Sequence, residues 1–133
     1  MYIKTGKVRF GYFQNAFLGD ESQWAAEAAE CASDQNKFWE YHDLLFSSQK
    51  GENQGAFSKD NLKQLAQKLG LDMQAFGDCI DSGNYTKAIQ QQTSLARQIG
   101  VQSTPSFLIN GTPLVGGQPF EAFQQIIEQF TGK

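Results

Sequence analysis

Two cysteines, Cys31 and Cys79, carry the most reactive side chains in the sequence. They stand far apart along the chain, which excludes a CxxC redox pair and a cysteine-rich zinc site. The apolar periodicity around each cysteine puts both thiols on the inward face of a predicted helix, where cysteines are usually unreactive. The residues alone leave two alternatives open, a single disulfide or two unrelated buried thiols.

His42 is the only histidine, and Asp43 follows it directly. Neighbouring positions on a helix do not face each other, so we do not expect these two side chains to pair as an acid and a base. A mononuclear metal site needs three or four ligands, and the sequence contains no cluster of histidines, cysteines or carboxylates that offers them. We therefore expect neither a metal nor a cofactor.

The chain has 133 residues, of which 40% are hydrophobic and 13% aromatic, which is enough for one hydrophobic core. Its formal net charge of −3 is spread without a basic block, which argues against a nucleic-acid partner. No apolar stretch approaches the roughly 18 residues of a membrane span, and Met1–Lys7 lacks the apolar core of a signal peptide. We expect one domain and no membrane span.

Apolar periodicity predicts a block of helices in the middle of the chain, preceded by a strand. Lys7–Phe13 alternates apolar and polar side chains, which is typical of a strand. Ser58 and Asp72 are the expected N-caps of two of the helices. The five helices are expected to begin near Glu21, to cover Phe38–Phe46 and Lys59–Leu69, to follow Asp72, and to span Tyr85–Ile99.

The last third of the chain predicts a β-hairpin followed by a helix. Asn110-Gly111 is a strong signal for a two-residue turn between the strands Ser106–Ile109 and Thr112–Val115. Pro113 suits an edge strand, because proline donates no ladder hydrogen bond. A final helix is expected over Gln118–Phe130. Its predicted buried side carries Phe120, Phe123, Ile126, Ile127 and Phe130.

Three parts of the sequence together resemble one known family. They are Val101–Gly111, then Phe17–Ser22 and Ala26–Ala32 with Lys37–Asp43, and Gly116–Phe120. In order and spacing they are similar to the DsbA-like, disulfide-bond-forming branch of the thioredoxin fold, and the likeness covers nearly the whole chain from Lys7 onward. The resemblance implies an α/β fold, a role in thiol–disulfide exchange, and a location outside the cytoplasm, either periplasmic or secreted.

The resemblance also assigns roles to individual residues. In this family the bond that matches Thr104–Pro105 is cis. The loop that matches Ser103, Thr104 and Pro105 presents its backbone to an extended peptide or protein substrate. Some relatives carry a second, structural disulfide at the positions that match Cys31 and Cys79, which implies that these two thiols are bridged.

The sequence departs from the family at its start. Members have a further strand and then a CxxC at a helix N-terminus, both ahead of the strand that matches Lys7–Phe13, and residues 1–133 contain no CxxC. We therefore expect an incomplete α/β thioredoxin-like fold, truncated at the N-terminus, as one domain over residues 1–133 with its helical insertion at about 20–100. The two strands that border the absent one, Lys7–Phe13 and Ser106–Ile109, then either pair directly or are completed by a homodimer.

Two functions remain open at this point. The first is a domain related to DsbA-like thiol–disulfide oxidoreductases that is catalytically inactive alone, with its redox centre upstream or on another polypeptide. The second is a non-catalytic scaffold that binds a peptide or a second copy of itself through the Pro105 loop and the open sheet edge. Both hypotheses place no catalytic residue within the 133 residues.

Overall fold

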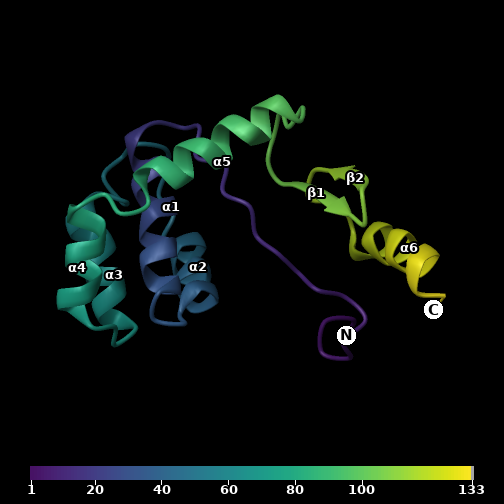
Figure 1. Ribbon diagram of the computed structural model, residues 1–133, viewed down its shortest axis with the longest axis horizontal. Helices are drawn as coiled ribbons and strands as arrows, with labels where there is room; N and C mark the ends of the chain where they lie inside the picture. Colours follow the sequence, from purple (N-terminus) through teal and green to yellow (C-terminus); the bar gives the residue numbers. More distant parts are fainter. Residues whose placement is uncertain (133) are drawn as a thin grey trace. The chain divides into compact units, whose positions relative to one another are not determined.

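The computed structural model describes residues 1–132, which form six α-helices and one two-stranded sheet (Figure 1). The five helices expected in the middle of the chain, the hairpin and the last helix are all confirmed. The helices are α1 (Asp20–Ser33), α2 (Phe38–Ser47), α3 (Lys59–Lys68), α4 (Met73–Asp81), α5 (Thr86–Gln98) and α6 (Phe120–Thr131), and the strands are β1 (Ser106–Ile109) and β2 (Thr112–Val115).

The chain divides into two compact units. Residues 14–95, which we call the helical unit, contain α1 to α4 and most of α5. Residues 1–13 and the described residues from 96 onward, which we call the hairpin unit, contain β1, β2 and α6. The expected single domain over residues 1–133 stays a prediction.

The core of the helical unit lies around α1, which packs against α2, α3 and α4. The inward face of α1 is rich in alanine, and small side chains let neighbouring helices approach closely. The Tyr41 ring is fully buried with its centroid 5.7 Å from that of Phe76, and its hydroxyl donates to the Leu62 carbonyl at 2.8 Å. Burial raises the pKa of Tyr41. The buried core also includes Ala28, Ala29, Cys31, Ala32, Leu65, Ala66, Cys79 and Ile80.

Local capping explains where two of these helices begin. The Ser58 side chain accepts a hydrogen bond from the Asn61 amide at 3.3 Å, and the Asp72 side chain accepts one from the Ala75 amide at 3.0 Å. Each bond satisfies one of the amide groups that a helix leaves unpaired in its first turn. Both predicted N-caps are therefore confirmed.

The long loop between α2 and α3 is fastened to the start of α1 by two side chains. The nearly buried Glu21 carboxylate accepts hydrogen bonds from the Gly55 amide at 2.7 Å and the Phe57 amide at 3.3 Å. In return, the Asn53 side chain accepts from the Glu21 amide at 3.4 Å and donates to the Leu18 carbonyl at 2.7 Å. A buried carboxylate is costly without such donors, so these contacts hold both the side chain and the loop in place.

The hairpin has the turn that its sequence predicts. Strands β1 and β2 are antiparallel, with Ile109 opposite Thr112. Asn110 and Gly111 have φ values of +50° and +88°, the positive angles that a type I′ turn requires. Asparagine and glycine are the residues that adopt these angles at least cost, which explains why the chain reverses here.

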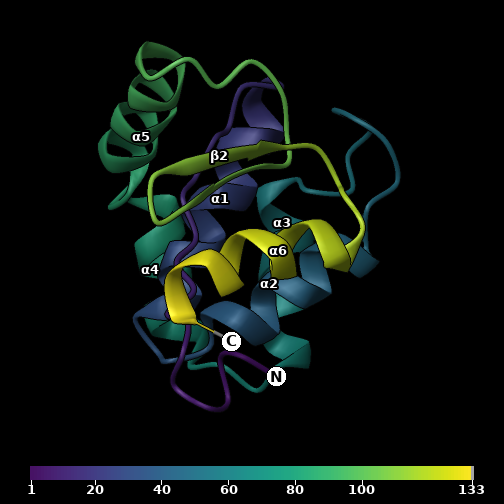
Figure 2. The same cartoon turned by 90° about the vertical axis from the view of Figure 1, so that its right-hand side faces the viewer.

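Helix α6 lies beside the hairpin (Figure 2) and packs on one of its faces. The Phe123 ring meets the Phe107 ring edge-on at a centroid distance of 4.8 Å. The first turn of the chain also packs on α6, because the buried Tyr2 donates its hydroxyl to Glu128 Oε1 at 2.8 Å and lies 6.4 Å from the Phe120 ring. The hairpin unit is thus built from local elements that meet at α6.

The prediction of a strand over Lys7–Phe13 is wrong. Within residues 1–132 the sheet contains only β1 and β2, and β1 pairs with β2 alone. Direct pairing of Lys7–Phe13 with Ser106–Ile109, the first of the two expected ways to complete the sheet, is therefore also wrong. An alternating pattern sorts side chains onto two faces, but it forms a strand only where a neighbouring backbone supplies the hydrogen bonds.

The side of α6 that the sequence predicts to be buried is only partly covered. None of the described residues of this helix is fully buried, and Phe120 and Phe130 are 54% and 49% exposed. A hairpin of two short strands offers too little area to cover a whole helix face.

Replacing Glu21 by alanine is expected to lower the free energy of unfolding by roughly 1.5–3 kcal/mol, because the amides of Gly55 and of the buried Phe57 lose a charged acceptor. Urea denaturation followed by circular dichroism measures the change. Glu52→Ala is the matched control, because Glu52 is an exposed residue of the same loop. Equal stability of the two variants would show that Glu21 does not hold the loop.

Candidate functional site

Ser103, Thr104 and Pro105 form an exposed loop directly before β1. The Thr104–Pro105 peptide bond is cis. The Pro105 carbonyl accepts a hydrogen bond from the Gly116 amide at 2.8 Å, and the Ser106 hydroxyl donates to the Ser103 carbonyl at 2.6 Å. These bonds tie the loop to the hairpin at the first residue of β1 and at the residue after β2.

The main chain of Thr104 is open to a ligand. Across residues 1–132, no backbone–backbone hydrogen bond involves its amide or its carbonyl, and the residue is exposed. An extended peptide binds by pairing with main-chain groups of this kind. The substrate-binding role of Ser103, Thr104 and Pro105 stays a prediction.

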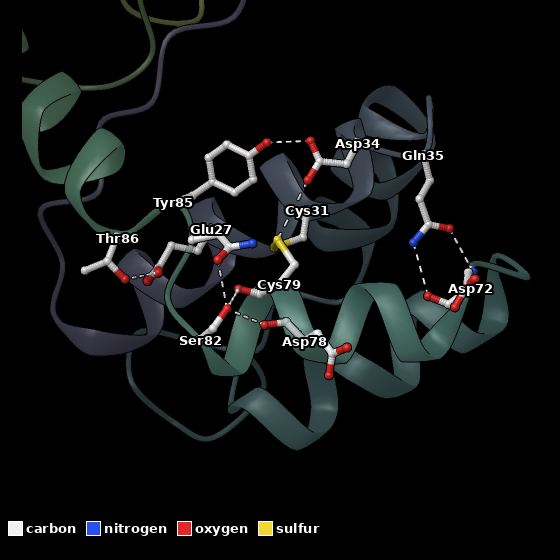
Figure 3. Close-up of a disulfide and its surroundings, with 11 residues drawn as sticks. Glu27, Cys31, Asp34, Gln35, Asp72, Asp78, Cys79, Ser82, Tyr85 and Thr86 are labelled. Atoms are coloured by element: carbon white, nitrogen blue, oxygen red, sulfur yellow. Dashed lines mark hydrogen bonds between the residues drawn. A yellow bond between two sulfur atoms is a disulfide. The ribbon is translucent and has the colours of Figure 1, made fainter.

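The structure joins Cys31 and Cys79 by a disulfide, with the two Cα atoms 5.9 Å apart (Figure 3). Cys31 belongs to α1 and Cys79 to α4, so the bond connects two helices that already pack against each other. The two residues are 1% and 6% exposed. Of the two alternatives that the residues left open, the structure contains the bridged form.

Polar side chains surround this disulfide (Figure 3). The Tyr85 hydroxyl donates to the Asp34 carboxylate. This hydrogen bond is the largest cause that raises the pKa of Tyr85 to about 12, and burial and the negative charges of Asp34 and Glu30 add to it. The Gln35 side chain donates to the Asp72 carbonyl at 3.1 Å and accepts from the Asp72 amide at 2.8 Å. These contacts attach the end of α1 to the residues that precede α4 and α5.

Glu27 is a second buried carboxylate on α1, and it is 4% exposed. It accepts hydrogen bonds from the Thr86 hydroxyl and from Gln23 Nε2, the latter at 3.4 Å. Gln23 Nε2 also lies 3.3 Å from the Thr86 carbonyl. Neutral donors therefore satisfy this carboxylate, and the contacts hold the first residue of α5 against α1.

Sequence reasoning did not identify Asp34, Tyr85 or Glu27 as neighbours of the disulfide. Asp34 follows Cys31 by one helical turn, a spacing that places two side chains on the same side of a helix, and this signal was available in the sequence. Tyr85 comes from a distant segment, so only the packing of the helical unit brings it to Asp34.

His42 and Asp43 contact each other, contrary to the prediction. His42 Nδ1 lies 3.0 Å from Asp43 Oδ1, because side chains at the surface of α2 are free to turn toward each other. The Asp43 side chain is 80% exposed, and such surface pairs contribute little to stability. The His42 ring also lies among the rings of Phe38, Trp39 and Phe46, which indicates packing on the helix surface.

Within residues 1–132, no group of three or more histidine, cysteine, aspartate or glutamate side chains is arranged to hold a metal ion. No helix in the part of the chain that the structure describes is long and apolar enough to cross a membrane. The expected lack of a metal and a cofactor stays a prediction.

A family model described as "Thioredoxin" matches residues 1–129 of the chain. The chain belongs to the thioredoxin family. Relatives that are disulfide bond formation proteins support the DsbA-like branch, as the resemblance implied. The predicted α/β thioredoxin-like fold is confirmed, and in residues 1–132 it takes the form of six helices and a two-stranded antiparallel sheet.

Three similar proteins illustrate this membership. The chain is 26% identical to the probable disulfide bond formation protein D of Bacillus anthracis over 132 residues, which is 96% of this chain and 60% of that protein. It is 34% identical over 106 residues to the Na(+)/H(+) antiporter NhaA 1 of Salinispora arenicola, which is 80% of this chain and 16% of the antiporter. The chain therefore spans less than two thirds of each of these two relatives.

One similar solved structure is a thioredoxin-like oxidoreductase from Silicibacter pomeroyi DSS-3. The two structures agree with a TM-score of 0.74 at 24% sequence identity, over 92% of this chain and 68% of the other. This similarity shows that the two proteins share a fold.

Replacing both bridged cysteines, as Cys31→Ala with Cys79→Ala, is expected to lower the free energy of unfolding by up to about 4 kcal/mol, because the bond closes a long loop in the unfolded chain. Guanidinium denaturation without reductant measures this loss, and the reduced wild type is the control, expected near the double variant. A thiol titration of the unreduced, denatured wild type should find no free thiol. Two reactive thiols would contradict the bond.

Tyr85→Phe is expected to change how stability depends on alkaline pH. The pKa of Tyr85 is raised from 10.0 to about 12, so the folded state favours the protonated hydroxyl. The Tyr85 contribution to the unfolding free energy is therefore complete below pH 10.0 and is lost as the pH rises through about 12. Denaturation of both proteins across this range should show the difference between them shrinking, and a difference independent of pH would exclude the effect.

Proposed function

We propose that residues 1–133 are part of a DsbA-like thiol–disulfide oxidoreductase, in which they bind the substrate polypeptide and do not perform dithiol exchange alone. One observation carries the proposal. Both cysteines of the sequence, Cys31 and Cys79, are used in one buried disulfide, whereas the loop at Ser103–Pro105 is exposed. The sulfurs and the accessible loop therefore serve different purposes.

The chemistry of exchange explains why these sulfurs are unsuited to it. A thiolate attacks one sulfur of a disulfide, a new S–S bond forms, and the old one breaks so that the other sulfur leaves as a thiolate. The attacking cysteine must be accessible and is activated by a helix N-terminus or a nearby positive charge. Cys31 lies near the C-terminal end of α1 and Cys79 near that of α4, both buried. We assign the attack to a CxxC outside residues 1–133.

Substrate binding is assigned to Ser103, Thr104 and Pro105. The exposure of all three residues and the open main chain of Thr104 support this assignment. Two bonds that tie the loop to the hairpin support it as well, because a site held by rigid elements loses less entropy on binding. The occupant is an extended segment of a peptide or protein.

The Cys31–Cys79 bond is assigned a structural role, and the protein is assigned a location outside the cytoplasm. Burial of both sulfurs between α1 and α4 supports the structural role. A disulfide of this kind persists in oxidising compartments, which supports a periplasmic or secreted location.

A non-catalytic scaffold is the second candidate. It is favoured by the lack of a free cysteine among the described residues, together with a sheet that has an unpaired edge at β1. The coding sequence upstream of Met1 separates the two candidates. An in-frame segment with a CxxC favours the oxidoreductase, and a gene that encodes no such segment favours the scaffold.

The substrate loop is tested by titrating the protein with reduced and alkylated insulin B chain, an unfolded probe without free thiols. We expect binding by the wild type and an affinity lower by about tenfold or more in Pro105→Ala, because the substitution changes the loop backbone. Pro119→Ala is the matched control, since Pro119 is another exposed proline outside the loop. Equal affinity of Pro105→Ala and wild type would remove the loop from the proposal.

An insulin-reduction assay tests the chemistry separately. The wild type and the double variant Cys31→Ala with Cys79→Ala are both expected to reduce insulin no faster than dithiothreitol alone. Acceleration by the wild type that the double variant lacks would overturn the claim that the redox centre lies elsewhere.

A further inference from the structure

The Cys31–Cys79 disulfide has a carboxylate beside the more exposed of its two cysteines. We propose that the Asp34 carboxylate protects this bond from reduction, because it repels the negatively charged thiolate that must attack Cys79. The proposal goes beyond the proposed function, since it names a residue that controls the reactivity of the bond itself toward any small thiol.

The two oxygens of Asp34 have different neighbours. Asp34 Oδ2 lies 3.9 Å from Cys79 Sγ, and Asp34 Oδ1 accepts a hydrogen bond from the Tyr85 hydroxyl (Figure 3). A bridged sulfur has no hydrogen to donate, so Tyr85, and not the sulfur, holds the carboxylate in this orientation. Asp34 is exposed, whereas Cys79 and Cys31 are 6% and 1% exposed. The negative charge is therefore held beside the sulfur that a reductant reaches more easily.

Reduction of the bond is a nucleophilic substitution at sulfur. A reductant thiolate attacks Cys79 Sγ, a mixed disulfide forms, and the bond to Cys31 Sγ breaks so that Cys31 leaves as a thiolate, which water protonates. A second reductant thiolate attacks the reductant's own sulfur in the mixed disulfide, which releases Cys79 as a thiolate and yields the oxidised reductant. The first attack brings an anion next to Asp34. Like charges about 4 Å apart in water slow such an approach by about fivefold.

The thiolate that leaves is also poorly stabilised. Cys31 lies in the last turn of α1 and Cys79 in the last turn of α4, where the helix dipole is negative, and neither turn contains a basic residue. Glu27 precedes Cys31 by four residues, so this nearly buried carboxylate lies on the same side of α1. A thiolate without a positive charge nearby is less stable and leaves more slowly.

The lysine that reaches the end of α4 is already paired. Lys63 Nζ lies 2.7 Å from Asp81 Oδ2, and Asp81 is the last residue of α4. The charge of Lys63 is therefore matched by another carboxylate, and it leaves the charge of Asp34 in place beside Cys79.

Protection of this kind separates two uses of sulfur in one protein. Thiol–disulfide exchange requires reactive thiolates near the bound polypeptide, and each of them is an anion that attacks accessible disulfides. The charge of Asp34 slows this attack at Cys79, so the structural bond stays closed while exchange proceeds elsewhere. This consequence rests on the proposed function, whereas the protection itself is tested without a substrate polypeptide or a redox centre.

Three small thiols of different charge test the proposal on the folded chain. The thiolates of mercaptoethanesulfonate, mercaptoethanol and cysteamine are doubly negative, singly negative and neutral overall. Asp34→Asn removes the charge but keeps an oxygen that accepts from Tyr85. We expect mercaptoethanol to reduce Asp34→Asn about fivefold faster than the wild type, with a larger increase for mercaptoethanesulfonate and the smallest for cysteamine. Asp43→Asn is the matched control, because it removes the same charge from an exposed side chain of α2, and it should be reduced like the wild type.

Acid quenching, alkylation and mass spectrometry measure the opened fraction over time, at rates expected to be proportional to thiol concentration. In about 1 M salt the difference between Asp34→Asn and the wild type should shrink, because charges are then screened beyond about 3 Å. Equal rates for the two proteins would overturn the proposal. Equal acceleration by all three thiols would overturn it as well and assign the effect to a less stable fold. A rate independent of thiol concentration would also contradict it, because unfolding would then precede the attack.

Discussion

The helical unit depends on the close packing of α1 against α2, α3 and α4. Alanines on the inward face of α1 allow this approach, and Tyr41 and Phe76 fill the space beside them. The Cys31–Cys79 bond joins two helices that this packing has already brought together. The covalent bond therefore adds to an arrangement whose origin is apolar burial, and it removes freedom mainly from the unfolded chain.

The buried carboxylates of this unit lie where other segments of the chain donate hydrogen bonds to them. Glu21 and Glu27 both belong to α1 and are nearly buried, yet each accepts hydrogen bonds from a different part of the chain. Glu21 holds the loop before α3, and Glu27 holds the start of α5. Since a buried carboxylate without donors is strongly unfavourable, these two side chains select the loop and helix positions that provide them.

The hairpin unit contrasts with this arrangement. It has few buried side chains, and among residues 1–132 the main chain of Thr104 makes no backbone–backbone hydrogen bond. Recognition by backbone pairing needs such exposure, and it needs little side-chain chemistry. In the proposed function, the buried sulfurs of the helical unit have a structural role, and the open backbone at Thr104 in the hairpin unit receives the substrate polypeptide.

The sequence by itself determined the elements whose hydrogen bonds close within a few residues, such as the helix caps at Ser58 and Asp72 and the turn at Asn110-Gly111. The tertiary structure alone decided that Lys7–Phe13 is not a strand, since a strand requires a partner that alternation cannot provide. It also decided that Tyr85 meets Asp34 beside the disulfide. Contacts between distant segments depend on how helices pack, and local residue patterns do not contain that information.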